Sequence, residues 1–160
     1  MSRIDADSLP VRPEEIDLEP FIAELLAILP GGDAVTYTPS GLVGRVVADP
    51  DHLARVLTNL VDNAIKYGGD EEIALTTSSV NGEIHICVID HGPGIPYEQH
   101  SRMFDRFTQL QPHATRSKGG AGLGLSIVRG LVEAMEGRVW YEPTLGGGAT
   151  FTVAIPAVES

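Results

Sequence analysis

Two segments in which apolar and polar residues alternate, joined by a two-residue turn, constrain the fold of this 160-residue chain more than any other feature. Residues 72–80 and 83–90 are rich in β-branched and apolar side chains, and Asn81-Gly82 lies between them. An Asn-Gly pair between such segments is the strongest short signal for a β-hairpin. Apolar residues recur at every second position of the second segment, so we expect one face of the hairpin to be buried.

Amphipathic helices are predicted before and after this hairpin. Residues 51–67 carry apolar side chains at helical spacing, with Asp49 as a candidate N-cap and Pro50 suited to the first helical position. Residues 17–29 and 122–136 show the same spacing over shorter lengths. Further short strands are expected near residues 34–38, 45–48, 138–142 and 149–155.

These elements together predict the fold class. Strands outnumber helices, so the helices can cover only one face of the sheet. We therefore expect a two-layer α+β sandwich, with a mixed, mostly antiparallel sheet covered on one face by about three helices, and not a doubly wound parallel fold. Residues 1–16 are polar, with two prolines, and are expected to be a tail or linker before a domain of residues 17–160.

The composition favours a globular domain with an acidic surface. Hydrophobic residues make up 42% of the chain and charged residues 21%. No apolar run approaches the ~20 residues needed to cross a bilayer, and the N-terminus lacks the apolar core of a signal peptide. We therefore expect a cytoplasmic location with no membrane span in this chain. The net charge of −11 disfavours nucleic acid as a partner, because neutralising phosphates needs a basic face.

A pair of asparagines on the helix of residues 51–67 is the first candidate for chemistry. Asn59 and Asn63 are four residues apart, so they lie on one edge of that helix. An amide oxygen suits Mg²⁺, and Lys66, one turn further on, is placed to reach a phosphate. Taken alone, a solvated amide pair is the better interpretation.

Asp90 ends the second hairpin strand and is the second candidate. A carboxylate only accepts hydrogen bonds, which matches the two donors of an adenine amine. Gly92 and Gly94 would let a planar base approach the backbone. An ordinary Asp-Gly turn explains this segment equally well.

A glycine-rich run at residues 119–124 opens the helix of residues 122–136 and is the third candidate. Its free N–H groups can bind an anion, although the pattern is neither a Rossmann fingerprint nor a P-loop. Taken alone, a flexible connection is the better interpretation. The long stretch before it is typical of a functional or disordered loop. Four of the five histidines show no metal-ligand spacing and are interpreted as surface or packing residues: His52, His85, His100 and His113.

In their order along the chain, these motifs resemble the catalytic, ATP-binding domain of bacterial two-component sensor histidine kinases. That domain has the Bergerat fold and belongs to the family shared with gyrase, Hsp90 and MutL. The similar segments are residues 59–67 (N box), 90–95 (G1 box), 103–107 (F box), 120–125 (G2 box) and 146–151 (the final glycine-threonine turn). The likeness covers residues 17 to 156.

The resemblance implies specific roles. ATP and Mg²⁺ would be the cofactors, Asn63 the metal ligand, Asn59 and Lys66 the catalytic residues, and residues 105–121 a lid over ATP. The implied nucleotide-contacting residues are Asn59, Asn63, Lys66, Tyr67, Asp90, Gly92, Gly94, Ile95, Phe107, Arg116, Lys118, Gly120, Gly122, Leu123, Gly124 and Thr150. Many relatives carry an arginine just after the F box, where this chain has Thr108-Gln109, and the candidate replacements are Arg106, Arg116 and Lys118.

The implied activity is transfer of the γ-phosphoryl group of ATP to a histidine on a separate dimerisation and phosphoacceptor hairpin, and from there to a response regulator. No histidine here has the sequence context of that acceptor, so the hairpin would be supplied in cis by a longer protein or in trans, and the protein could be the cytosolic part of a membrane-bound sensor. Asn59 stands where the related ATPases carry a general-base glutamate, which disfavours simple ATP hydrolysis. A non-catalytic nucleotide-binding module and an anti-sigma-factor-type serine kinase remain the alternatives.

Overall fold

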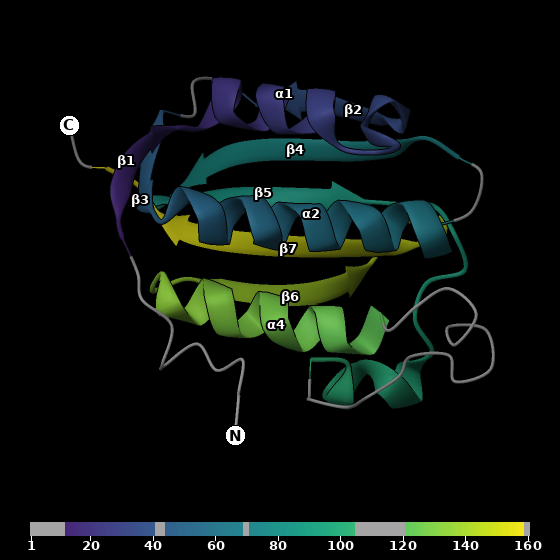
Figure 1. The fold of residues 1–160 in the computed structure, drawn as a ribbon. Coiled ribbons are helices and arrows are strands. Elements are labelled where there is room, and N and C mark those ends of the chain that lie inside the picture. Colours follow the sequence, from purple (N-terminus) through teal and green to yellow (C-terminus); the bar gives the residue numbers. More distant parts are fainter. Residues whose placement is uncertain (1–11, 41–43, 69–70, 105–120, 159–160) are drawn as a thin grey trace.

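A five-stranded mixed sheet forms one layer of the protein, and three helices form the other (Figure 1). The computed structural model describes residues 12–40, 44–68, 71–104 and 121–158. The strand order is β2-β4-β5-β7-β6, and only the β2–β4 pairing is parallel. The strands of this sheet are β2 (Val35–Pro39), β4 (Ile73–Val80), β5 (Glu83–Ile89), β6 (Arg138–Pro143) and β7 (Ala149–Pro156). The helices are α1 (Leu18–Ile28), α2 (Pro50–Tyr67) and α4 (Ala121–Ala134), with two short 3₁₀ helices, η2 (Gly32–Ala34) and η3 (Tyr97–Arg102).

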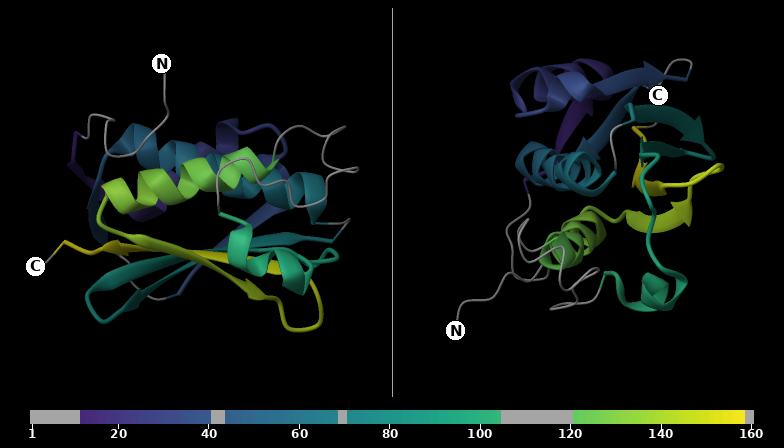
Figure 2. Two further views of the ribbon diagram at one scale, coloured as in Figure 1. Left: turned by 90° about the horizontal axis from the view of Figure 1, so that it is seen from below. Right: turned by 90° about the vertical axis from the view of Figure 1, so that its right-hand side faces the viewer.

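The two-layer α+β sandwich predicted from the sequence is confirmed. Figure 2 shows α1, α2 and α4 on one side of the sheet. The predicted hairpin joins β4 to β5, with Val80 opposite Glu83. Asn81 and Gly82 have φ angles of 51° and 82°, the positive values that a two-residue turn between twisted strands requires.

The core lies between the helices and the inner face of the sheet. The apolar stripe of α2 and the alternating apolar residues of β5 belong to one buried cluster, as their periodicities predict. The buried members from these two elements are Leu53, Val56, Leu57, Leu60, Val61, Ala64, Ile84, Ile86 and Val88. Within the described residues, none of the helices has the combination of length and apolar character needed to traverse a bilayer.

A second, two-stranded sheet corrects the expected tail. β1 (Glu14–Asp17) pairs with β3 (Arg45–Ala48) in antiparallel register, so residues 14–16 belong to the folded unit. Ile16 is buried, but a four-residue strand with one buried side chain leaves too short a pattern to recognise. The remainder of the predicted tail, residues 1–11, lies outside the described residues.

Asp49 connects this second sheet to the start of α2. Its Oδ1 accepts hydrogen bonds from the backbone N–H groups of Asp51 and His52, at 2.9 and 3.3 Å, as the predicted N-cap should. Its Oδ2 accepts a bond from the N–H of Arg12 at 2.8 Å. Burial raises the pKa of this carboxyl group, but the hydrogen bonds that it accepts outweigh burial, and the net effect lowers the pKa.

We expect Asp49→Ala to reduce the free energy of unfolding by about 1–2 kcal/mol at pH 7, because α2 loses its cap. Since the folded-state pKa of Asp49 is lowered, its contribution is complete above the unfolded value of about 3.9 and is lost as the pH falls through the folded value. Urea unfolding of both proteins between pH 7 and pH 3 should therefore show their difference shrinking in acid. Asp51→Ala, which removes an exposed acid two residues further along in the first turn of α2, is the control and should cost less than about 0.5 kcal/mol. A difference that does not vary with pH would contradict a charged cap.

Candidate functional site

The predicted motifs come together at one end of the sandwich. The last turn of α2, the end of β5 and the first turn of α4 all lie at the right-hand end in Figure 1. Gly68, which follows α2, lies against Asp90, which follows β5: an ideal Cβ placed on Gly68 would come within 2.7 Å of the Asp90 Cβ. Residues from three distant parts of the sequence thus share one site.

Asp90 is the best-defined polar group of this site. Its side chain is only 7% exposed. Oδ1 accepts hydrogen bonds from the backbone N–H groups of Gly92 and Ala149, both at 3.0 Å. No group in the described part of the chain donates a hydrogen bond to Oδ2. One oxygen therefore fixes the carboxylate, and the other remains an acceptor for a ligand.

The backbone of Asp90 is also held from outside β5. Its N–H donates to the carbonyl of Ala149 at 2.9 Å, and its carbonyl accepts from the hydroxyl of Thr144 at 3.0 Å. The Thr150 hydroxyl lies 2.9 Å from that of Thr144. Because Thr144 gives its single proton to Asp90, Thr150 is the donor of this second bond. Thr150, a predicted nucleotide-contacting residue, therefore also supports Asp90 through Thr144.

Glycines allow these backbones to approach closely. An ideal Cβ on Gly92 would lie 2.5 Å from the carbonyl carbon of Gly68, and one on Gly148 would collide with the carbonyl oxygen of Asp90. Gly148 also has a φ of 122°, which L-residues with a side chain rarely adopt. Gly94, with a φ of 76°, has its Cβ position 3.0 Å from the carbonyl oxygen of Gly148. The sequence analysis assigned roles to Gly92 and Gly94 but missed the packing role of Gly68 and Gly148.

The polar residues of α2 line the same end. Asn59 and Asn63 are both partly buried, and the Nδ2 atom of Asn63 is buried without a hydrogen-bond partner among the described residues. Since an amide can be turned so that its oxygen takes this position, Asn63 offers either a donor or a neutral oxygen ligand. Lys66 pairs with Asp62 at 3.1 Å on the exposed side of the helix.

Asn63 passes a simple test as a magnesium ligand. The described residues contain no group of three His, Cys, Asp or Glu side chains suited to a metal ion. Mg²⁺ bound together with phosphates needs only one or two protein oxygens and takes the rest from phosphate and water. The Asn63 side chain, whose Nδ2 has no partner among the described residues, would meet that need with the amide turned so that its oxygen faces the ion.

The first turn of α4 provides a helix N-terminus at this end of the molecule. An ideal Cβ on Gly124 would meet no atom within 4 Å in the described structure. The unpaired N–H groups of a first helical turn attract anions. Gly122, Leu123 and Tyr67 are located by their backbones within the two helices. The other predicted contacts, Phe107, Arg116, Lys118 and Gly120, lie outside the described residues.

Two residues that the sequence analysis did not select hold the loop after Asp90. The N–H of Ile95 donates to the hydroxyl of Tyr141 at 3.4 Å, and the carbonyl of Ile95 lies 2.8 Å from Nε2 of His100. His100 was interpreted as a surface or packing residue, whereas here it makes a polar contact with a predicted site residue. Tyr141 is 46 residues from Ile95 in the sequence and His100 is five, and no local pattern links either residue to Ile95, so the sequence held no signal for these contacts.

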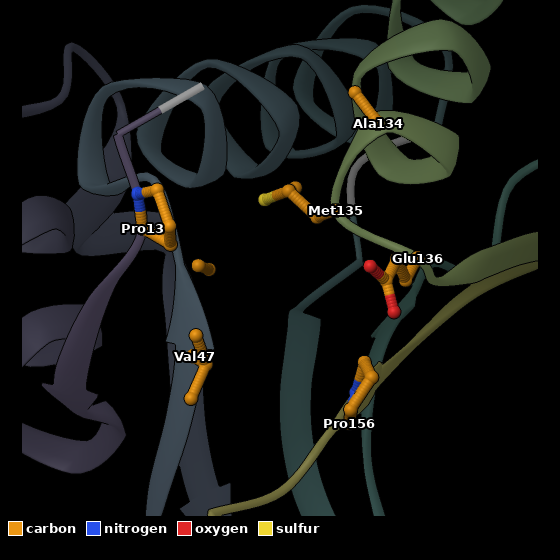
Figure 3. A pocket seen from close by; sticks show the side chains of 7 residues that line it. Pro13, Val47, Ala134, Met135, Glu136 and Pro156 are labelled. Carbon is orange, nitrogen blue, oxygen red and sulfur yellow. The ribbon is translucent and has the colours of Figure 1, made fainter.

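A pocket of about 220 Å³ lies at the C-terminal end of α4 (Figure 3). None of the predicted site residues lines it, and its lining is mostly apolar. The lining residues are Pro13, Val47, Ala48, Ala134, Met135, Glu136 and Pro156. This pocket is therefore separate from the candidate site.

Comparisons with known proteins agree with this arrangement. The adaptive-response sensory kinase SasA of Synechococcus elongatus is 35% identical over 164 residues, covering 97% of this chain and 41% of SasA. The crystal structure of full-length ShkA in complex with AMPPNP superposes with a TM-score of 0.79 at 28% identity, covering 96% of this chain and 33% of ShkA. The histidine kinase ThkA, solved in complex with the response regulator protein TrrA, gives a TM-score of 0.75 at 25% identity over 92% of this chain and 42% of ThkA.

The chain spans less than half the length of the curated relatives that it matches, between 19% and 41% for three of them. The family model described as histidine kinase-, DNA gyrase B-, and HSP90-like ATPase matches residues 48–159, which include α2, Asp90 and α4. The resemblance drawn from the sequence motifs is thus confirmed, and the chain belongs to the family of histidine kinase-, DNA gyrase B- and HSP90-like ATPases.

Proposed function

We propose that this chain binds Mg-ATP at the Asp90 end of the sandwich and donates the γ-phosphoryl group to a histidine on a separate dimerisation and phosphoacceptor hairpin. The sensor-kinase names of its relatives and the AMPPNP bound in ShkA support a kinase role. The single observation that carries the proposal is the buried Asp90 carboxylate with one oxygen left to accept.

Asp90 would recognise the adenine base. An amine bonded to Oδ2 would replace the water lost on burial, and a carboxylate offers nothing to a base that presents an acceptor at the same place. Gly92 and Gly94 leave the backbone bare beside it, so a flat ring can lie against the loop. The base would thus be chosen by hydrogen-bond type and held by shape.

The phosphates would extend toward α2 and α4. The first turn of α4 offers N–H groups and the positive end of the helix dipole. Lys66 would turn from Asp62 toward a phosphate, and Arg116 and Lys118 would add positive charge from the lid. Asn63 would hold Mg²⁺, which would supply positive charge against the phosphates. An acidic protein needs these local positive charges because its net charge of −11 repels ATP.

Asn59 would favour transfer to a protein over transfer to water. An amide cannot take a proton from water at neutral pH, so an attacking water would receive little help. An imidazole nitrogen needs no such base: it forms the new P–N bond while the bond to the β,γ-bridging oxygen breaks and leaves its electron pair on ADP. Catalysis then depends on positioning and charge neutralisation, which a nucleotide site on a rigid helix can supply.

The partners follow from the proposed reaction. The acceptor hairpin would belong to the same longer protein or to a separate chain, and a response regulator would receive the phosphoryl group next. The complex of ThkA with TrrA supports that second step. ATP as the donor places the site on the cytoplasmic side of any membrane to which the whole protein is attached.

We expect Asp90→Asn to weaken ATP-analogue binding about 10- to 100-fold. The new Oδ1 can still accept from Gly92 and Ala149, so the fold should be kept, while the new NH₂ group opposes the adenine amine. Calorimetric titration with AMPPNP and Mg²⁺ measures the change. Asp51→Asn, an exposed acid at the other end of α2, is the control and should bind normally. Unchanged affinity in Asp90→Asn would refute the base-recognition role.

Asn59→Glu should raise the rate of ATP hydrolysis by about 10-fold or more, because it introduces a carboxylate able to take a proton from water. Asn59→Gln is the matched control, since glutamine has the length of glutamate but remains an amide. Phosphate release under saturating Mg-ATP gives both rates. Equal rates in the two variants, or fast turnover by the unmodified chain, would show that Asn59 does not limit hydrolysis.

A chimera in which this chain replaces the ATP-binding part of a sensor histidine kinase tests the complete proposal. With γ-labelled ATP we expect acid-labile, alkali-stable label on the hairpin histidine, and none after Asp90→Asn or after replacing that histidine by alanine. Acid-stable label on serine would instead indicate the serine-kinase alternative. Nucleotide binding without any label would indicate a non-catalytic module.

A further inference from the structure

The loop of residues 90–95 is held at both ends. At Asp90 it is tied to β7 by the two bonds to Ala149 and to Thr144 by a third. At Ile95 both backbone polar groups meet side chains from elsewhere, Tyr141 of β6 and His100 of η3. We call His100 and Tyr141 the Ile95 clamp.

Each bond of the clamp has a defined direction. The Ile95 carbonyl can only accept, so Nε2 of His100 must carry a proton and donate it. The Ile95 N–H can only donate, so the Tyr141 hydroxyl accepts and keeps its own proton for another partner. The clamp therefore requires one ring N–H and one hydroxyl oxygen, and it is not simply hydrophobic packing.

The two rings of the clamp support each other and rest on the core. Their centroids are 4.7 Å apart with an interplanar angle of 62°, and the Tyr141 ring lies 5.5 Å from the buried Phe151 of β7. Phe104 packs edge-on against the same Phe151 at 6.1 Å. The clamp thus sets the Ile95 end of the loop relative to the strand that also holds Asp90.

The position of Gly94 shows why a small shift matters. Its Cβ position lies 3.0 Å from the Gly148 carbonyl oxygen and 3.6 Å from the Tyr141 hydroxyl. The loop backbone at Gly94 therefore lies close to both Gly148 and Tyr141, and we expect loss of a clamp bond to let the Ile95 end of the loop move relative to Asp90. A base bound between the Asp90 carboxylate and the Gly94–Ile95 backbone is bound selectively only if the distance between these two groups stays fixed.

We propose that His100 and Tyr141 are positioning residues that fix the 90–95 loop and so set the preference of the site for adenine over guanine. This inference rests on the proposed nucleotide-binding function. With the loop fixed, guanine brings its O6 acceptor against the Asp90 carboxylate and is rejected. With the loop released, the base can shift sideways, so affinity for ATP falls and discrimination against GTP falls with it.

Four variants separate positioning from simple structural support. Tyr141→Phe removes only the hydroxyl and keeps the ring on Phe151. His100→Leu removes the donor, whereas His100→Gln keeps an N–H donor at similar reach. Trp140→Phe is the matched control. Trp140 precedes Tyr141 in β6 and lies on the opposite face, and the substitution removes a hydrogen bond from its ring N–H to Glu142 at 3.3 Å.

Calorimetric titrations with AMPPNP and GMPPNP give the affinities, and amide hydrogen exchange of the nucleotide-free protein reports on the loop. We expect Tyr141→Phe and His100→Leu to weaken AMPPNP binding about 3- to 10-fold. The ratio of AMPPNP affinity to GMPPNP affinity should fall about threefold or more, and amide exchange at Ile95 should become faster. His100→Gln should recover most of the ratio, and Trp140→Phe should match the unmodified chain. The double variant should lose less than the sum of the two single losses, since both residues act on one loop.

The failures are distinguishable. Suppose that the unmodified chain binds AMPPNP, and that both clamp variants keep its ratio of AMPPNP to GMPPNP affinity and its hydrogen-exchange rate at Ile95. The clamp proposal is then overturned and the proposed function stands. The same loss in Trp140→Phe would also overturn it, by indicating general destabilisation. If the unmodified chain binds neither nucleotide, both the proposed function and the proposed role of the clamp in selectivity are refuted.

Discussion

The whole site depends on one buried carboxylate oxygen shared by two backbone N–H groups. Oδ1 of Asp90 joins the loop after β5 to the first residue of β7, and the glycines around it let three backbones come within contact distance. A buried charge is tolerated only when it is hydrogen-bonded, so this pairing both stabilises Asp90 and fixes the direction of its second oxygen. The structure thereby fixes the orientation of the Asp90 carboxylate through contacts within the chain itself.

Local sequence signals predicted most of the fold. The turn at Asn81-Gly82, the cap at Asp49 and the apolar stripe of α2 each depend on residues within a few positions of one another, and each is present in the structure. The same holds for Asp90 at the end of β5, where strand alternation and a following glycine mark the position. Such features are visible in a single chain because their partners are neighbours in sequence.

The features that the sequence did not reveal depend on distant partners. β1 is stabilised by β3, about thirty residues away, and its own four residues carry almost no pattern. Gly148 is required because Asp90 lies against it, which no local rule could indicate. Tyr141 and His100 look like a core residue and a surface residue until the fold brings both to Ile95. The candidate residues were thus easier to find in the sequence than the distant residues that hold them in place.

The bond between Asp90 and Ala149 spans 59 residues and so places the site late in the order of assembly. The β4–β5 hairpin can form from neighbouring residues, but β7 is the last strand to be synthesised and inserts between β5 and β6. Until it does, Asp90 has neither Ala149 to orient it nor Gly148 to pack beside it. A chain that ends before β7 can therefore form the β4–β5 hairpin, but its Asp90 side chain lacks the Ala149 N–H that orients it.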